Sequence, residues 1–273
     1  MSELPAWSLP AGAAKDIGIA SGFPVEITRE WALGGSTGAG VRVCILDSGV
    51  DASHPKVGHL DSAIAVTKNE DGIAVVGIDV AGDVCGHGTA CAGIVRSVAP
   101  DAEIHSVRVL GPGYTGGGNI MLAGLRYAIE QGFDVVNMSL STTKKDYSEV
   151  LHELADSAYF QRTLLVASAH NMPVESYPWR FSSVISVGSH DREDPLTYFV
   201  NPAPPVEFFA RGMGVDVAWL GGGRITATGN SFAAPHLSGI VALIRSAHRM
   251  LTPVQMKTVL AQTANNADAD AGR

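Results

Sequence analysis

The sequence predicts a three-layer α/β fold, in which helices cover both faces of a mostly parallel sheet. Two observations predict it. Short runs of β-branched and other apolar residues alternate along the chain with longer stretches of helical character. The candidate strands are also apolar at nearly every position, as expected of strands that are buried on both faces of a parallel sheet.

The candidate elements follow one another from residue 41 onward. Strands are predicted over residues 41–46, 73–78, 104–110, 135–140, 164–169 and 184–187. Helices are predicted over residues 87–95, 118–131, 147–158, 231–248 and 252–263. The last helix has a clear start, because Thr252 can cap it and Pro253 suits its first position. Residues 196–223 are rich in Pro and Gly and are predicted to form surface loops.

Neither an internal repeat nor a long linker interrupts this alternation, so residues 41–273 are predicted to form one domain. Residues 1–40 are predicted to form an N-terminal extension that packs on it. The N-terminus has no basic segment followed by an apolar run, as a signal peptide would have. We therefore expect a cytoplasmic location, with secretion left open if the chain is a fragment.

Composition excludes several classes of protein. The chain has 273 residues, of which 46% are hydrophobic and 17% charged, which suffices for a sizeable core. Its net charge of −8 disfavours a general binder of nucleic acid or of anionic membranes. The most apolar helix candidate, residues 232–244, is shorter than the ~18–20 residues that cross a bilayer. The chain has only three cysteines, and this small, odd number does not suit a disulfide framework.

Two apparent ligand motifs lack essential parts. Residues 111–116 fit the dinucleotide pattern G-x-G-x-x-G, but no carboxylate ends the following strand, since Asp134 begins it. Cys85, His87 and Cys91 could suggest zinc, but no paired Cys or His motif supplies a fourth ligand. We therefore predict neither a dinucleotide site nor a metal site.

Three residues of catalytic type lie where predicted elements begin or end. Asp47 ends the first strand in ILDSGV, His87 enters a helix in CGHGTA, and Ser231 enters an apolar helix in TGNSFAAPH. Each alone has an ordinary structural explanation. Together they supply what a serine nucleophile needs, because its hydroxyl reacts only when a base accepts the proton and an acid holds that base.

These motifs match those of subtilisin-like serine proteases in sequence, order and spacing, and the chain resembles the subtilase family from about residue 41 to residue 263. The resemblance implies a subtilisin-like αβα fold and a catalytic domain over residues 41–273. It implies that Asp47 orients the base, that His87 is the general base and acid, and that Ser231 is the nucleophile. The segment VASAHN resembles the family segment whose asparagine completes the oxyanion hole. Asn171 and the backbone N–H of Ser231 are then the two oxyanion donors.

The resemblance also implies a substrate cleft with two walls, one of which pairs with an extended peptide as an added strand. The residues implied to contact substrate are Leu110, Tyr114, Gly116, Ser139, Leu140, Ala169 and His170.

The chain departs from the family pattern around this cleft. The serine motif is Gly-Asn-Ser-Phe-Ala in place of the usual Gly-Thr-Ser-Met-Ala. His170 and Trp179 each stand where the family usually has glycine, so we expect a reshaped primary pocket. Glu175 could favour a basic substrate side chain there, but we predict that it is a solvated loop carboxylate.

No cofactor is expected. The helix after His87 runs without the calcium-binding insertion of many secreted relatives, so their tight calcium site is predicted to be absent. Cys91, four residues after His87, resembles the cysteine of the thiol-containing branch of the family. This resemblance implies a thiol beneath the catalytic histidine.

The sequence therefore predicts a serine endopeptidase that cleaves peptides or proteins through an acyl-enzyme. A transpeptidase or macrocyclase on the same triad is one alternative, although the 40 residues between Asp47 and His87 leave little room for a capping insertion. An inactive binding scaffold is another, although all four catalytic positions hold competent residues. Only 46 residues precede Asp47, fewer than the folding prodomain of secreted relatives needs. We expect no nucleic-acid or membrane partner, and leave open a regulatory partner or further domains.

Overall fold

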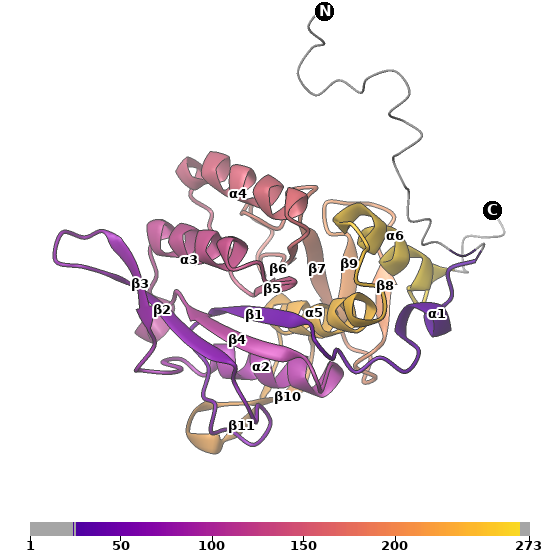
Figure 1. Ribbon diagram of the computed structural model, residues 1–273, viewed down its shortest axis with the longest axis horizontal. Coiled ribbons are helices and arrows are strands. Elements are labelled where there is room, and N and C mark those ends of the chain that lie inside the picture. The colour runs from indigo at the N-terminus through magenta and orange to yellow at the C-terminus, as the bar shows by residue number, and fades with distance from the viewer. Residues whose placement is uncertain (1–23, 25, 268–273) are drawn as a thin grey trace, which may run out of the picture.

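A nine-stranded sheet lies between two layers of helices in the computed structural model, which describes residue 24 and residues 26–267 (Figure 1). The strand order is β3-β2-β4-β1-β5-β6-β7-β9-β8, and all neighbours from β2 to β9 are parallel. The edge strands β3 and β8 are antiparallel to their neighbours. This arrangement confirms the predicted three-layer fold.

The strands of this sheet and of a separate hairpin have the following bounds: β1 Arg42–Asp47, β2 Ser62–Lys68, β3 Ala74–Ile78, β4 Glu103–Arg108, β5 Val135–Met138, β6 Leu164–Ser168, β7 Ile185–His190, β8 Tyr198–Val200, β9 Phe208–Arg211, β10 Val215–Ala218 and β11 Arg224–Ala227. The helices are α1 Arg29–Leu33, α2 His87–Val98, α3 Gly118–Glu130, α4 Ser148–Phe160, α5 Asn230–Ala247 and α6 Pro253–Thr263. The described residues also include three short 3₁₀ turns: η2 Pro112–Tyr114, η3 Lys145–Tyr147 and η4 Leu220–Gly222.

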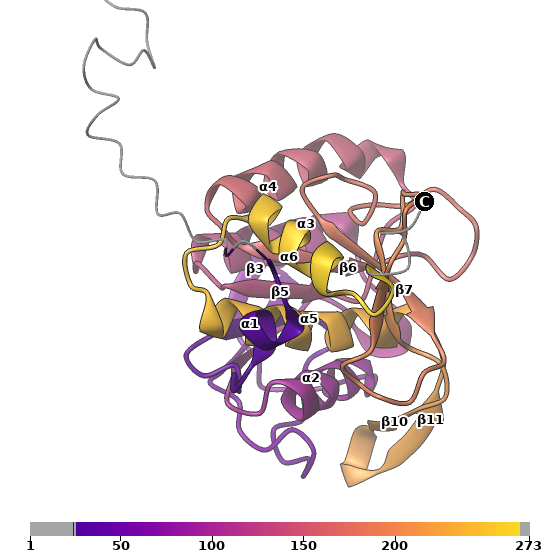
Figure 2. The ribbon, with the colours of Figure 1, turned by 90° about the vertical axis from the view of Figure 1, so that its right-hand side faces the viewer.

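The central strand β1 shows how the two cores are built. Val43 and Ile45 belong to the core cluster that includes residues of α2, α5 and α6, whereas Cys44 and Leu46 belong to the cluster that includes residues of α3 and α4. The helices α2 and α5 lie on the opposite side of the sheet from α3 and α4 (Figure 2). All four side chains are buried, because a strand directs successive residues to opposite faces and both faces are covered. The nearly continuous apolar runs predicted this burial for the central strands.

The prediction that residues 73–78 are buried on both faces is wrong. A strand does form there as β3, but it is the outermost strand and pairs only with β2. Ile73 is 60% exposed and Ile78 81% exposed. An apolar run alone does not distinguish a central strand from an edge strand. In addition, the sequence did not predict β2, which lies between β3 and β4.

The prediction that residues 196–223 form only surface loops is also wrong. They contain β8 and β9, which extend the main sheet beyond β7, and β10, which pairs with β11. In β9, Phe208 and Ala210 are buried whereas Phe209 and Arg211 are only partly buried. The strands are short, and the Pro-rich segment between β8 and β9 concealed them.

The helix ends follow the predicted signals. At α6, the Thr252 side chain caps the Gln255 backbone N–H, and the Gln255 side chain accepts from the Thr252 N–H at 2.9 Å. The helix thus begins with a capping box, which satisfies two backbone donors that have no intrahelical acceptor.

The short helix α1 packs against α5 and α6, with Ala32 buried in the core that these helices share. The rest of the predicted N-terminal extension lies largely outside the described residues. In the described part of the chain, every helix is too short or too polar to span a bilayer.

Candidate active site

The predicted catalytic residues lie where one strand ends and two helices begin, at the carboxyl ends of the parallel strands. Asp47 is the last residue of β1, His87 the first of α2, and Ser231 lies in the first turn of α5. Gly86 before His87 has φ +90°, and a Cβ there would lie 2.7 Å from the Trp219 ring. Only glycine fits this turn without strain, so the backbone itself fixes where α2 presents the histidine.

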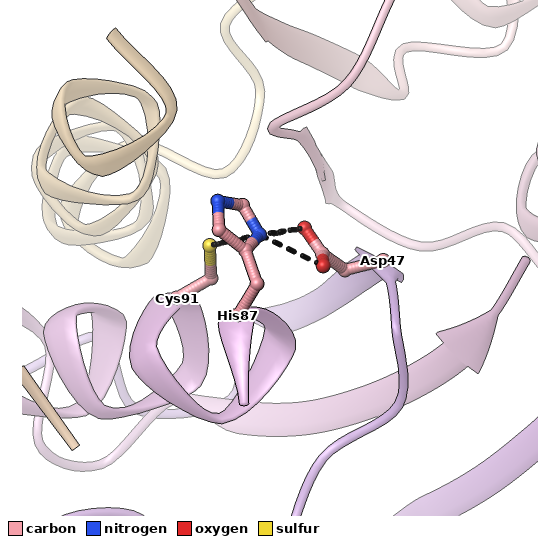
Figure 3. A group of neighbouring side chains, drawn as sticks. All are labelled: Asp47, His87 and Cys91. Atoms are coloured by element: carbon pink, nitrogen blue, oxygen red, sulfur yellow. Dashed lines mark hydrogen bonds and ion pairs between the residues drawn. The ribbon is translucent and has the colours of Figure 1, made fainter. Parts of the chain in front are cut away.

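Asp47 and His87 are joined in the interior (Figure 3). Nδ1 of His87 lies 2.9 Å from each carboxylate oxygen of Asp47, whose side chain is fully buried. The Ser48 backbone N–H also donates to this carboxylate, at 2.7 Å. Because a carboxylate only accepts, the proton of the neutral imidazole belongs on Nδ1, which leaves a lone pair on Nε2.

The surroundings of His87 act on its pKa in opposite directions. Burial lowers the pKa because it disfavours the charged ring, but the Asp47 carboxylate, by its charge and its hydrogen bond, raises it. The net result is a pKa well above the ordinary value of 6.5. The ring therefore holds a proton firmly once it has accepted one.

Asp83 fixes the loop that precedes His87, a role the sequence did not suggest. Its carboxylate accepts from the backbone N–H groups of Cys85 and Gly86 at 2.9 and 2.8 Å, and from the N–H and hydroxyl of Thr89 at 2.8 and 2.5 Å. It also accepts from the Ser48 hydroxyl at 2.8 Å. One carboxylate thus ties the end of β1 to the start of α2. An aspartate just before a helix was the available signal.

Ser231 and His87 line one cleft of about 290 Å³. The described residues include no hydrogen bond between the Ser231 hydroxyl and His87, although both residues line this cavity. Catalytic hydrogen bonds are often long before substrate binds, so this arrangement is compatible with proton transfer. The backbone N–H of Ser231 has no intrahelical acceptor, because it lies in the first turn of α5.

Asn171 lies on the same cleft. Its side-chain oxygen accepts from the Asn230 backbone N–H at 2.9 Å. An amide has one oxygen and one NH₂ group, so this contact engages the oxygen and leaves the NH₂ group to donate elsewhere. A donor set of this NH₂ group and the Ser231 N–H could bind a developing oxyanion.

The fold agrees with the comparisons to known proteins. The sequence model of the subtilase family matches residues 38–273. The chain belongs to the subtilase family. Membership assigns it to the serine peptidases, which act on peptides or proteins.

Individual relatives are similar over most of this subtilase chain. It is 32% identical over 248 residues to the minor extracellular protease Epr of Bacillus subtilis (strain 168), covering 86% of this chain but 36% of that protein. It is 30% identical over 250 residues to subtilisin DY of Bacillus licheniformis, covering 85% of this chain and 86% of that one. The structure is also similar to the crystal structure of a cold-adapted subtilisin-like serine proteinase, with a TM-score of 0.69 and 26% sequence identity. The match covers 86% of this chain and 87% of that chain.

A buried hydrogen-bond chain holds the carbonyl of Ser231 in this subtilase. Pro235 has no N–H, so it cannot make the helix bond to the carbonyl four residues earlier. The Ser139 hydroxyl donates to that carbonyl instead, at 2.8 Å. Asn137 donates to the Ser139 oxygen and accepts from Ser238, both at 3.0 Å. The first turn of α5 is thus anchored to the end of β5.

Cys91 lies beneath the histidine, as the family resemblance implied (Figure 3). Its sulfur is 3.9 Å from His87 Nδ1, 3.9 Å from Asp47 and 3.4 Å from the Ser139 oxygen. The side chain is fully buried, and burial raises the pKa of the thiol. Metal ions are commonly held by three or more His, Cys, Asp or Glu side chains. Among the described residues, Asp47, His87 and Cys91 are the one group of three such side chains close enough to share an ion. Their existing hydrogen bond would have to be replaced for an ion to bind.

The cleft brings together most of the residues implied to contact substrate. It is lined by His87, Leu110, Tyr114, Ser139, Leu140, Ser141, Ser168, Ala169, His170, Asn171 and Ser231. Gly116 was also implied but does not line it; this glycine packs against Leu110, since a Cβ there would lie 2.9 Å from that side chain.

Trp179 and Glu175, unlike His170, do not line this cleft. The Trp179 ring is buried, and its N–H donates to the Ser176 hydroxyl at 2.7 Å. Glu175 accepts from the Tyr177 hydroxyl at 2.6 Å and lies 3.5 Å from Arg180. Trp179 and Glu175 line a second cavity of about 560 Å³ instead. Glu175 is exposed, as predicted for a loop carboxylate.

Proposed function

We propose that this chain is an endopeptidase that cleaves peptide bonds through an acyl-enzyme formed on Ser231. The observation that carries the proposal is the buried Asp47–His87 pair, because this histidine lines the same cleft as Ser231. An acid, a base and a nucleophile are the parts that the reaction requires.

In the first half of the reaction, Nε2 of His87 accepts the Ser231 proton while Oγ attacks the substrate carbonyl carbon. The carbonyl oxygen becomes negative, and the Asn171 NH₂ group and the Ser231 N–H donate to it. His87 then gives its proton to the leaving amine nitrogen as the C–N bond breaks. This leaves an ester between Ser231 and the acyl part of the substrate.

In the second half, a water molecule replaces the departed amine. His87 accepts a proton from this water as it attacks the ester, and returns the proton to Ser231 Oγ when the acid product leaves. Asp47 stabilises the imidazolium form in both halves without itself taking the proton. All proton transfers use side chains of this chain, so we also propose that no cofactor takes part. Activity that survives dialysis against EDTA is the expected result.

The test is labelling with a fluorophosphonate, which reacts with activated serines. We expect labelling of the native chain and none of Ser231→Ala. Ser246→Ala is the matched control. Ser246 also lies on α5, but it does not line the cleft, and its hydroxyl donates to the Ala39 carbonyl. This variant should take the label like the native chain. A folded native chain that takes no label would overturn the mechanism.

Products decide between hydrolysis and the amine-resolved alternative. Mass spectrometry of a digested peptide should show fragments whose masses sum to substrate plus water. Joined or cyclised products without added water would assign the chain to transpeptidation on the same triad.

A further inference from the structure

Asn230 precedes the nucleophile and stands where the family motif usually has threonine. We propose that Asn230 is a positioning residue that holds the oxyanion segment 169–171 against the helix carrying Ser231. The proposal rests on the function proposed above, because it concerns where the oxyanion donor of that reaction lies.

The Asn230 side chain joins two neighbouring strand ends. Its Oδ1 accepts from both the backbone N–H and the hydroxyl of Ser189, at 3.0 and 2.9 Å. Its Nδ2 lies 3.2 Å from the Ala169 carbonyl and 3.4 Å from the His170 carbonyl. Ser189 belongs to β7, whereas Ala169 and His170 follow β6, so one amide connects both strands to the start of α5.

The orientation of this amide is fixed by its partners. The Ser189 N–H can only donate, so it requires the amide oxygen. The two carbonyls can only accept, so they require the NH₂ group. A threonine has a single oxygen on a shorter side chain and cannot replace both ends of the amide. The bridge is therefore a property of asparagine at this position.

The backbone of Asn230 acts on the same segment. Its N–H donates to Oδ1 of Asn171 at 2.9 Å, and this contact leaves the NH₂ group of Asn171, which lines the cleft, to donate to an oxyanion. Gly229 supports the arrangement, because a Cβ there would lie 3.4 Å from Nδ2 of Asn171. Asn230 thus touches residues 169, 170 and 171 in succession, by side chain for the first two and by backbone for the third.

This placement predicts an effect mainly on the transition state, although Ala169 and His170 of the same segment also line the cleft. Oxyanion donors act at about 2.7–3.1 Å from the oxygen, so a small shift of segment 169–171 weakens them. The negative oxygen exists only after attack, and an interaction made only then changes kcat without changing KM.

The experiment is a double-mutant cycle of Asn230→Ala with Asn171→Ala, with kcat expressed per fluorophosphonate-reactive site so that unfolded protein is not counted. We expect Asn230→Ala to lower kcat about tenfold, with KM changed less than about twofold. In the Asn171→Ala background the same change should cost less than about twofold, because the group it positions is gone.

The matched control is Asn266→Ala. The Asn266 amide also bridges backbone groups, donating to the Val200 carbonyl at 2.8 Å and accepting from the Val200 N–H at 2.9 Å, far along the chain from the cleft. It should leave kcat per reactive site unchanged. If Asn230→Ala does not fold, Ser189→Ala, which removes one of the two bonds to Oδ1, should lower kcat by about two- to threefold with the same dependence on Asn171.

Equal losses from Asn230→Ala in both backgrounds, or an unchanged kcat, would overturn the proposal. A loss expressed in KM would overturn it too. Failure of the proposed function has a different signature, since the native chain would then neither take the label nor cleave peptides.

Discussion

At the scale of single residues, the site depends on which atoms can donate and which can only accept. The Asp47 carboxylate sets the tautomer of His87, and the Asn230 backbone sets the orientation of the Asn171 amide. Neither arrangement requires substrate. The charges and dipoles that the reaction needs are therefore in place before the reaction begins, which is how a protein avoids reorganising them during catalysis.

The raised pKa of His87 predicts a pH profile. Neutral imidazole is the form that accepts a proton, so kcat/KM should rise with pH and reach half its maximum above 6.5. In Asp47→Asn, the carboxylate that raises the pKa is gone while burial remains, so the His87 pKa should fall. Rates over pH 5–9 test the native chain, and NMR titration of the ring tests the variant. A native midpoint below 6.5 would contradict the prediction.

The Asn171 side chain predicts a second effect. Asn171→Ala should lower kcat by about 10²–10³, because removal of one oxyanion donor costs about 2.7–4 kcal/mol, a value measured in a subtilisin. KM should change little, and steady-state kinetics on a short peptide measure both. A loss confined to KM would instead assign Asn171 to ground-state binding of substrate.

At the scale of elements, α5 carries the proposed nucleophile on a helix that is buried along most of its length. From Phe232 to Arg245 every residue of this helix is buried. The helix lies under β5, β6, β7 and β9, and Pro235 leaves a free carbonyl that Ser139 occupies. The position of Ser231 is thus fixed by the core as well as by the active site, since a shift of the helix would disturb both.

The burial of His236 in α5 predicts a loss of stability in acid. Burial lowers the His236 pKa to about 4, despite the hydrogen bond from Nδ1 to the Phe232 carbonyl at 2.8 Å. The unfolded chain therefore binds the proton more tightly. The stabilisation from the neutral ring is complete above about pH 6.5 and is lost as pH falls toward 4, by up to about 3 kcal/mol.

Urea unfolding between pH 4 and 8 measures this loss. In His236→Gln the part of the slope due to this ring should disappear, whereas the exposed His59→Gln control should keep the native slope. Equal slopes in all three proteins would show that His236 does not titrate on unfolding.

At the scale of the whole molecule, the sheet differs greatly between its centre and its β3 edge. Central strands are covered on both faces by helices, whereas β3 lies beyond β2 at the edge of the sheet and exposes apolar side chains (Figure 1). The predicted catalytic residues lie at the carboxyl end of β1 and beside the ends of β5 and β6, so buried central strands carry the candidate site.

This difference predicts unequal costs for similar substitutions. Ile45→Ala removes a fully buried side chain in β1 and should lower the free energy of unfolding by about 2–5 kcal/mol. Ile78→Thr changes a residue that is 81% exposed in β3 and should change it by about 0.5 kcal/mol or less. Chemical denaturation gives both values. Comparable costs would mean that β3 is covered in solution.

The sequence by itself determined the alternation of strands and helices, the burial of β1 and the end of the strand or helix that carries each predicted catalytic residue. These features depend on local periodicity, helix capping and short motifs, and each of these is set by residues that are close together in the sequence. The same local information failed for β3 and for β8 and β9, because an edge strand and a central strand can have the same apolar composition.

Only the tertiary structure decided which side chains meet. The sequence did not single out Asp83 and Asn230 as positioning residues. Their hydrogen-bond partners lie on other elements of the fold, or are backbone groups whose positions are set by the folded chain. Ser139 and Pro235 lie far apart in the sequence, yet one supplies the hydrogen bond that the other cannot make. The physical reason is that a hydrogen bond depends on distance and direction in space, whereas a motif records only order along the chain.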